Sequence, residues 1–444
     1  QPPDNRMKLT SFITNRRGGL RRALTLTLLT GLAACPNVLA KPGGNGGGKG
    51  GGGNDGGGDP PPPPAPVAYQ VSWVDLADST YIEGVNSQGT AVGYARWSGD
   101  PSGPTGFLRF VDGEVHDLND VLSDHLPTDP TTGQPWVIGA GFEITEDFII
   151  AGNMRDPDGG RHAFATKLQD LGPALLPEVL WFQILSGADL GAPVQTEPHG
   201  VRVQDAGQNG EVLLQLGGEA WDDGLDRTFV WRPETGLLLD PPIVEGPWIE
   251  SNNYYSERMN SQSQVVLPPE RVVVDTITGL ESSVTVGGYP MDIGHDGMLV
   301  GIVESTARVK GYGWTTIAAA GRCVDGVWEP ITDFWPRGGS SRWLTAAYHV
   351  NDAGHIVGFN NGPMFLFVDD GATKLREVEA LLDFTGDPDG EAFWNSLSDG
   401  FDWNLTSLRE ISEPDATGFG WICGESYLGS GRRVGFILRP IAAP

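Results

Sequence analysis

A ten-residue phrase recurs along the chain, and it constrains the fold more than any other feature. It reads GVNSQGTAVG at residues 84–93, HVNDAGHIVG at 349–358 and DIGHDGMLVG at 292–301. Each copy has an apolar residue, a tight polar turn and a short apolar strand that ends in Gly. A repeat the size of one β-hairpin predicts a fold built by stacking similar units.

The turn position of this phrase can be followed along the whole chain after residue 68. The equivalent positions are predicted to be Asn86, Thr145, Gln204, Asn260, Gly294, Asn351 and Ser412. A second phrase follows most copies: an aromatic strand such as residues 106–110 or 162–166, and in some copies an Asp-Gly turn after it. Asp-Gly favours a tight hairpin because Gly accepts positive φ. Each unit therefore predicts four antiparallel strands.

Residues 68–444 contain runs of β-branched and aromatic residues separated by Gly, Asp, Asn and Pro, which is typical of short strands. One four-stranded unit cannot cover both faces of its own sheet, but a ring of units buries those faces. We therefore predict an all-β fold, a β-propeller with seven blades of four antiparallel strands; six blades are the alternative. The chain ends on a third strand at residues 435–439, so residues 69–76 are expected to close the last blade. Short helices are expected at 118–124 and 375–383.

The two phrases together resemble the HAF repeat of bacterial exported proteins. The pattern of that repeat is roughly apolar-Asn-x-x-Gly-x-Val-Val-Gly, then a loop, then His-Ala-Phe-Leu. Residues His162-Ala163-Phe164 have its literal form, whereas Gly294 replaces the turn Asn and the fourth copy lacks the Gly pair at Ser263 and Pro268. The resemblance implies an exported, propeller-like protein and no shared catalytic residues.

The N-terminal region predicts export. Residues 7–34 combine a basic start with a short apolar stretch, which is typical of an export signal and too short for a stop-transfer helix. Cys35 follows Leu-Ala-Ala, as in a lipobox, and is a candidate for lipidation; cleavage after Ala40 is the alternative. Residues 35–67 are rich in Gly and Pro and predict a disordered linker. We expect the protein on the bacterial cell surface, in the periplasm or in the medium, with membrane contact only through a lipid on Cys35.

The charge balance and the cysteines limit partners and compartment. The chain has 57 acidic and 29 basic residues, a net charge of -28. Such a surface repels phosphate backbones, so nucleic acid is not expected as a partner. It suits solubility, cation uptake or a basic partner. Cys323 and Cys423 could pair outside the cytoplasm, but two buried free thiols on separate strands is the favoured interpretation.

Two Asp-Pro-Asp-Gly sequences are the candidates for a metal site. Asp156 and Asp158, and again Asp387 and Asp389, place two carboxylates close together in a form that could hold Ca²⁺. Because Pro sets φ and Gly accepts positive φ, a plain turn is the favoured interpretation. No other cofactor is predicted. The seven histidines lack the spacing of a zinc helix.

Motifs for a catalytic nucleophile are missing from the sequence, since Gly-x-Ser-x-Gly does not occur. Trp97, Trp221 and Trp394 lie in expected loops, where they could stack on sugars; burial between blades is the favoured use. We therefore predict a non-enzymatic extracellular binding module for a polysaccharide or a protein. The alternatives are a glycan-active enzyme with paired carboxylates in a central channel, and a structural component of the envelope.

Overall fold

The computed structural model describes the chain from residue 67 to residue 442, with gaps. The described ranges are 67–99, 103–169, 176–191, 200–207, 209–216, 227–233, 235–238, 243–244, 258–267, 272–284, 287–309, 313–336, 345–369, 375–397 and 407–442. They all belong to one compact unit, Pro62–Pro444. The predicted export signal, Cys35, nearly all of the predicted linker and Trp221 lie outside them. Within the described ranges, no helix has the length and apolar character needed to span a membrane.

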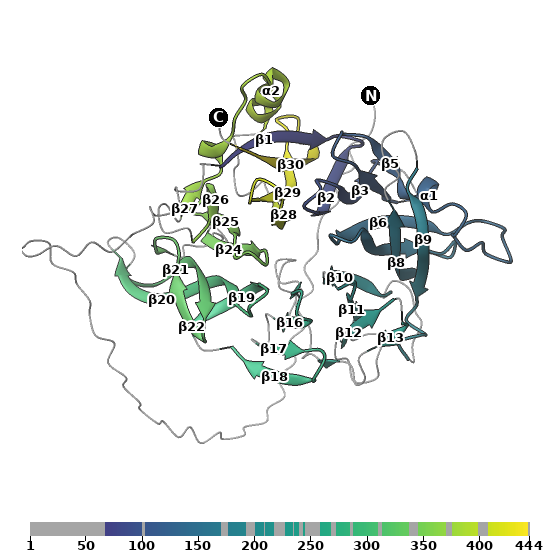
Figure 1. The fold of residues 1–444 in the computed structure, drawn as a ribbon, viewed down its shortest axis with the longest axis horizontal. Coiled ribbons are helices and arrows are strands. Elements are labelled where there is room, and N and C mark those ends of the chain that lie inside the picture. Colours follow the sequence, from purple (N-terminus) through teal and green to yellow (C-terminus); the bar gives the residue numbers. More distant parts are fainter. Residues whose placement is uncertain are drawn as a thin grey trace, which may run out of the picture. The chain divides into compact units, whose positions relative to one another are not determined.

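The strands form antiparallel sheets that follow one another along the chain (Figure 1). The first sheet consists of β2 (Ser79–Val85), β3 (Ala91–Arg96), β4 (Thr105–Arg109) and β5 (Val115–Asp117). The second consists of β6 (Val137–Ile144), β7 (Ile149–Arg155), β8 (Arg161–Gln169) and β9 (Glu178–Leu185). The third consists of β10 (Arg202–Ala206), β11 (Val212–Leu216), β12 (Arg227–Arg232) and β13 (Leu237–Leu238), with β14 (Ile243–Val244) also on β12.

The remaining sheets continue this order. The fourth consists of β15 (Arg258–Met259), β16 (Gln264–Leu267), β17 (Val272–Asp275) and β18 (Leu280–Ser283). The fifth consists of β19 (Gly288–Ile293), β20 (Leu299–Val309), β21 (Gly313–Val324) and β22 (Val327–Pro330), with β23 (Trp335–Pro336) also on β21. The sixth consists of β24 (Thr345–Val350), β25 (Ile356–Asn360), β26 (Met364–Phe367) and β27 (Leu375–Glu377). The last four strands are β28 (Ser407–Pro414), β29 (Gly420–Tyr427), β30 (Arg433–Ala442) and β1 (Val67–Val74). One parallel pair, Ser79 of β2 with Arg433 of β30, joins them to β2–β5 in a single eight-stranded sheet, whose two halves we call the first sheet and the last sheet.

Each sheet packs against the next one, and the last sheet packs against the first through β28, β29 and β2. The apolar core lies between neighbouring sheets. Between the first two, for example, Val92 and Leu108 pack with Ile138, Ile150 and Phe164. Face-to-face packing of successive small sheets in a closed order is the architecture of a β-propeller. The predicted fold class, an all-β propeller, is therefore confirmed.

The Gly that ends the repeated phrase is explained by close packing inside each sheet. A Cβ on Gly93 would lie 1.9 Å from the carbonyl oxygen of Tyr81 on the inner strand and 3.0 Å from the ring of Phe107. Gly358 meets Ala346 and the ring of Phe365 in the same way. The Gly of the first phrase and the Phe of the second are therefore contact partners across two strands. This contact joins the two phrases into one structural unit.

The turn in the first copy shows why its polar residues recur. The side-chain Oδ1 of Asn86 accepts hydrogen bonds from the backbone N–H groups of Gln88 and Thr90. Gly89 has φ +76, and a Cβ there would lie 2.5 Å from the ring of Trp421 in the last sheet. In the second and fourth copies Phe148 and Ser263 occupy this position at φ 59 and φ 61, a region that costs non-Gly residues free energy.

β1 is hydrogen-bonded to the end of the chain. It pairs with β30 over eight residues, from Val67 opposite Ala442 to Val74 opposite Gly435. Tyr69 is fully buried, and its hydroxyl donates to the carbonyl oxygen of Gly420. β1 is therefore the outer strand of the last sheet, although it is the first strand in the sequence.

A buried ionic network joins the last sheet to the first one. Arg409 makes two hydrogen bonds to Glu425, of 2.8 and 2.6 Å, and its Nε lies 3.4 Å from Glu83 of β2. The Glu425 side chain is 1 % exposed. The guanidinium of Arg433 lies 4.8 Å from the centre of the Tyr81 ring. Charges buried this deeply are stable only when paired, so this junction depends on all its members.

The helices differ in part from those expected. α1 (Leu118–Val121) falls within the predicted 118–124. The prediction of a helix at 375–383 is wrong, because residues 375–377 form β27 and only the 3₁₀ turn η2 (Glu379–Leu381) follows. α2 (Pro388–Ser396) was not predicted. Asp387 is its N-cap, which accepts from the N–H of Gly390, and Pro388 fills the first turn, where its missing N–H has no partner to lose.

Candidate functional site: a central cavity lined by carboxyl groups

One position recurs at the centre of the fold. It is the residue two positions before the turn on the innermost strand of each sheet. These residues are Gly84, Glu143, Asp205, Arg258, Asp292, His349 and Glu410. In all these strands except the short β15, the register shifts at this point by a β-bulge. A bulge redirects the next side chain. The side chains of the six residues other than Gly84 line a cavity of about 60 Å³, together with residues of the adjoining turns.

Three of these carboxylates connect neighbouring sheets. Glu410 accepts a hydrogen bond from the N–H of Val85 at 2.8 Å. Asp205 accepts from the N–H of Met259 at 2.7 Å. Asp292 accepts in the same way from Val350 at 3.0 Å. Each bond satisfies an N–H group on the next inner strand, so the carboxylates support the fold as well as line the cavity.

Gly84 is the seventh residue at this position, and its lack of a side chain leaves space for the carboxyl group of Glu410. A Cβ at this position would lie 3.2 Å from Oε2 of Glu410 and 3.1 Å from the backbone nitrogen of Ile144. A side chain there would therefore displace the Glu410 carboxyl group.

The cavity holds more acidic than basic groups. Burial raises the pKa of Glu410 to about 8 and that of Asp205 to about 6. Burial also raises the pKa of Glu143 well above its usual value, and the hydrogen bond between the carboxyl groups of Glu143 and Glu410 adds to this. The pKa values of both carboxyl groups are therefore raised, and burial is the largest cause for each. Burial lowers the pKa of His349, which favours the neutral imidazole.

Arg258 is the guanidinium among these groups. Its Nη1 lies 3.6 Å from Oδ1 of Asp205. Burial disfavours its charge, but Asp205, Asp292 and Glu143 more than compensate, and the pKa of Arg258 is raised. The arginine therefore stays charged, and it offsets only part of the carboxyl charge around it.

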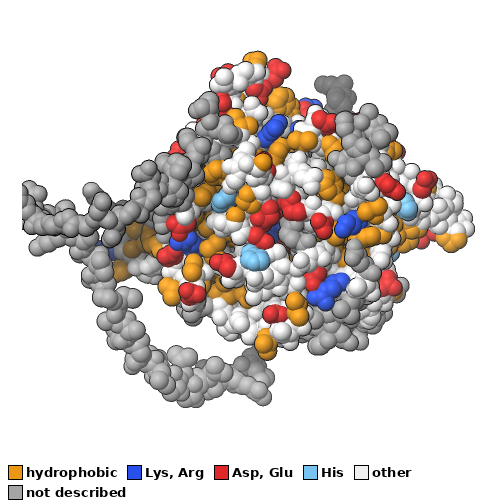
Figure 2. Space-filling view, in the orientation of Figure 1, with side chains coloured by type: hydrophobic (Ala, Val, Ile, Leu, Met, Phe, Trp, Pro, Cys, Tyr) orange, Lys and Arg blue, Asp and Glu red, His pale blue; other side chains and the backbone are white. Residues whose placement is uncertain are grey.

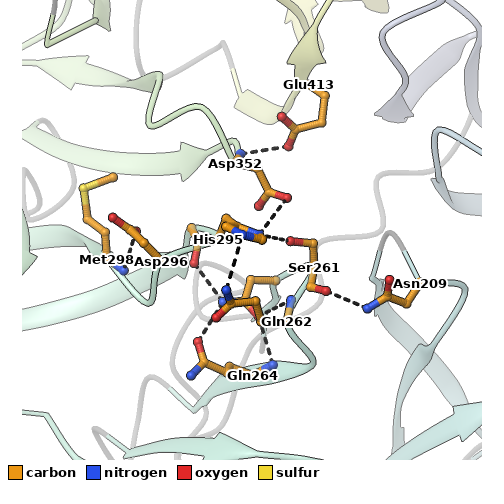
Figure 3. Close-up of polar contacts among 11 residues, drawn as sticks. Asn209, Ser261, Gln262, Gln264, His295, Asp296, Met298, Asp352 and Glu413 are labelled. Atoms are coloured by element: carbon orange, nitrogen blue, oxygen red, sulfur yellow. Dashed lines mark hydrogen bonds and ion pairs between the residues drawn. The ribbon is translucent and has the colours of Figure 1, made fainter.

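A second polar layer lies at the turns, one residue after each turn position, and we call it the cavity mouth. Among the described residues its members are Ser87, Glu146, Ser261, His295, Asp352 and Glu413; the corresponding residue of the third copy, Gln208, lies outside them. Glu413 accepts from the N–H of Asp352 at 2.8 Å, and Glu146 accepts from the N–H of Ser87 at 2.9 Å (Figure 3 shows the first). Figure 2 shows acidic side chains gathered near the centre of this face. Burial raises the pKa of Glu413 to about 7.

Ser261, His295 and Asp352 meet at the mouth, but not as a catalytic triad (Figure 3). Ser261 Oγ lies 2.6 Å from Nδ1 of His295, and Asp352 Oδ2 lies 3.5 Å from the same nitrogen. The other ring nitrogen, Nε2, lies 3.3 Å from the side-chain amide of Gln262. A triad needs the hydroxyl and the carboxylate on different ring nitrogens. This arrangement positions the imidazole without activating the serine.

The predicted metal candidates lie in two different places. Asp156 forms a turn: its Oδ1 accepts from the N–H of Gly160, and its Oδ2 lies 3.0 Å from Nε2 of His162. Asp158 lies in the same turn. Asp387 caps α2, and Asp389 lies in the first turn of that helix. The oxygens of Asp156 and Asp387 thus already accept protein hydrogen bonds.

The structure also shows where the tryptophans, the cysteines and one predicted turn position of the sequence analysis lie. Trp394 is buried in α2, whereas Trp97 is 41 % exposed. Cys323 on β21 and Cys423 on β29 are both buried, and they are thiols rather than a disulfide. The prediction of Gln204 as a turn position is wrong: the turn bonds link Gly207 with Glu211 and Gly210, so Gly207 is the equivalent residue. In this copy Gly207 replaces the turn Asn, as Gly294 does in the fifth copy, and the small Ala206 is the apolar residue before it.

The cavity residues were not identified from the sequence. The sequence feature that marks them is a charged or ionisable side chain two residues before the turn, which occurs in six of the copies. That signal depends on the bulges, because only a bulged strand turns this side chain towards the centre. A hairpin prediction with regular pairing does not contain bulges.

Comparisons with solved structures show distant similarities. No family model matches the chain, and no curated protein matches it. It is similar to the β-propeller domain of the Trilobed protease from Pyrococcus furiosus, at 12% identity over 68% of this chain and 81% of that one, with a TM-score of 0.34. It is also similar to XC5397 from Xanthomonas campestris, a gluconolactonase, at 11% identity over 86% and 99%, with a TM-score of 0.28. Similarities this weak carry no argument about activity.

Proposed function

We propose that this chain is an exported, non-enzymatic β-propeller of seven blades, closed by β1, and that it acts as a binding module outside the cytoplasm. We further propose that the cavity mouth receives a positively charged group of a protein partner. The blade count is supported by the seven repeats and by the division of the eight-stranded sheet into two groups of four strands, beside five other sheets. Closure is supported by the pairing of β1 with β30. Export rests on residues 7–34 and on the resemblance to HAF repeats.

One observation carries the proposed binding: carboxyl groups outnumber basic groups around the cavity. Seven carboxyl side chains lie inside the cavity or at its mouth: Glu143, Asp205, Asp292, Glu410, Glu146, Asp352 and Glu413. Among the described residues of this set, Arg258 is the one guanidinium, and His295 and His349 are the imidazoles. A cationic group at the mouth is attracted to those carboxyl groups of the set that are ionised, and it favours ionisation of Glu413.

The size of the cavity favours a side chain over a sugar. Its volume of about 60 Å³ is far below the roughly 300–1,000 Å³ of pockets that enclose small molecules. A lysine ammonium or an arginine guanidinium is small enough to enter from a partner that rests on the rim. The glycan-active enzyme is less well supported, because Glu143 and Glu410 are in direct hydrogen bond, whereas glycosidases keep about 5 Å or more between their two carboxyl groups.

Calorimetric titration of the full chain with decalysine tests this proposal. We expect binding at low salt that weakens at least tenfold in the double variant Glu413→Gln/Asp352→Asn. The matched control is Asp124→Asn/Glu281→Gln, which removes the same charge from exposed positions away from the mouth and should bind like the parent. Binding should also release protons at pH 7, because a cation stabilises the ionised form of Glu413. Equal weakening in both double variants would show attraction by net charge alone and would reject the mouth as the site.

A further inference from the structure

The hairpin of β20 and β21 extends beyond the packed part of its sheet. These strands have 11 and 12 residues, and Figure 1 shows them reaching outwards from the other strands. The near half is core, where Ile302 and Ala318 pack with Ala346 of the sixth sheet. β20 starts beside the turn at Gly294 and runs away from it. The far half therefore lies at the end of the sheet opposite the cavity mouth.

The strand register places a defined set of side chains on one face of this hairpin. Arg308 is opposite Trp314, Thr306 is opposite Thr316, and Ala318 is opposite Trp335 of β23. Paired residues point to the same side, and so do residues two apart along a strand. This is the face turned towards the sixth sheet, because Ala318 packs against that sheet. We call it the hairpin face.

Two tryptophans mark the ends of the hairpin face. Trp314 is 74 % exposed, the highest value among the large apolar side chains of the described residues. Trp335 is 39 % exposed, and its Nε1 donates to Oδ1 of Asn360 at 3.0 Å, which fixes the orientation of the indole. Ala318 lies four residues from Trp314, so the two indoles are about 13 Å apart along the strand direction. The hydroxyl groups of Thr306 and Thr316 lie between them.

We propose that the hairpin face binds a neutral polysaccharide, with sugar rings stacked on Trp314 and Trp335 and sugar hydroxyls bonded to Thr306 and Thr316. An indole exposed to this extent gains free energy when an apolar surface covers it. The flat C–H face of a pyranose is such a surface, and its rim consists of hydroxyl groups. A protein partner would favour a continuous apolar patch, but here threonines separate the aromatic rings.

Charge also favours a neutral ligand. The hairpin face carries one basic side chain, the exposed Arg308, and one acidic side chain, the half-buried Glu304 opposite Ala318, so its formal charges cancel. This site is separate from the cavity mouth, and the two proposals can fail independently.

Affinity electrophoresis of the full chain in gels that contain hydroxyethyl cellulose, xylan or mannan tests the inference. We expect at least one polymer to retard the parent, and Trp314→Ala to weaken that binding at least tenfold. Trp97→Ala is the matched control, because Trp97 is an exposed indole that directly follows β3 of the first sheet, and its removal should have no effect. Trp314→Phe should restore part of the binding, since it retains an aromatic face.

Three results would overturn the inference. The parent could migrate freely in all three polymers, or Trp314→Ala could bind as tightly as the parent. Alternatively, light scattering could show that the parent is a dimer and Trp314→Ala a monomer. That last result would assign the hairpin face to contact between two copies of the chain.

Discussion

Removal of β1 tests whether the first strand of the sequence closes the ring. The perturbation is deletion of residues 67–74, which leaves β30 without its outer neighbour. The deletion exposes the backbone of β30 along eight paired residues and uncovers the core between the sixth and last sheets, where Tyr69 and Val71 are buried. We expect a protein that still forms strands but unfolds at much lower temperature or denaturant concentration.

The size of the effect follows from three buried side chains. Tyr69, Val71 and Val74 are 0 %, 4 % and 3 % exposed. Burial of one such side chain contributes about 1.5–3 kcal/mol, so the three contribute roughly 5–9 kcal/mol as an upper bound. Domains are stable by only about 5–15 kcal/mol in total. The deletion therefore removes a large share of the free energy of unfolding, and at about 2 °C per kcal/mol it lowers Tm by on the order of 10 °C.

The assay is thermal and urea unfolding of the parent and the deletion variant, followed by circular dichroism and tryptophan fluorescence. Addition of a synthetic peptide of residues 67–76 should raise the Tm of the deletion variant with increasing peptide concentration, because binding to the folded state stabilises it by mass action. Leu76→Ala is the control, since Leu76 follows β1 and is 37 % exposed. A deletion variant that melts within about 2 °C of the parent would refute the reasoning.

Two further predictions concern single residues. Ser263→Gly should raise the free energy of unfolding by about 1 kcal/mol in urea unfolding, because Ser263 has φ 61. Gly89→Ser should lower it, because the new side chain would clash with Trp421. Equal effects of the two substitutions would contradict this prediction. Burial raises the pKa of Glu410 to about 8 from 4.5, so the folded state holds more protons than the unfolded state between these values. The contribution of Glu410 to stability should therefore be fully present at and below pH 4.5 and be lost as the pH rises through 8. Glu410→Gln should flatten this part of the pH dependence of melting curves, and an unchanged slope would contradict the prediction.

The fold was largely predictable because its signals are local and repeated. The Gly and Phe of the two phrases contact each other within one sheet, so each copy contains the information for its own hairpins. Residues 69–76 were assigned to the last sheet by counting strands, and β1 does pair with β30. The helix α2 was missed although Asp387 and Pro388 are a good N-cap and first residue, because Asp-Pro-Asp-Gly is equally typical of a turn.

The candidate site was less accessible from sequence, since it arises from contacts between distant copies. Glu410 and Glu143 are neighbours across the cavity, yet they belong to the last and second sheets. Ser261 meets His295 and Asp352 only because three successive turns converge on one point. Sequence patterns place each residue on its strand, whereas the convergence depends on the closed order of sheets and on the bulges.

Carbodiimide coupling of decalysine to the full chain, followed by mass spectrometry of the cross-linked peptides, tests the proposed binding most directly. This reagent joins an amine to a carboxylate only when the two are in contact, so it reports where the cationic group lies. We expect Glu413, Asp352 and Glu146 to carry most of the cross-links at moderate salt. Cross-links spread over exposed carboxylates such as Asp124 and Glu281, with no preference for the mouth, would contradict the proposed function.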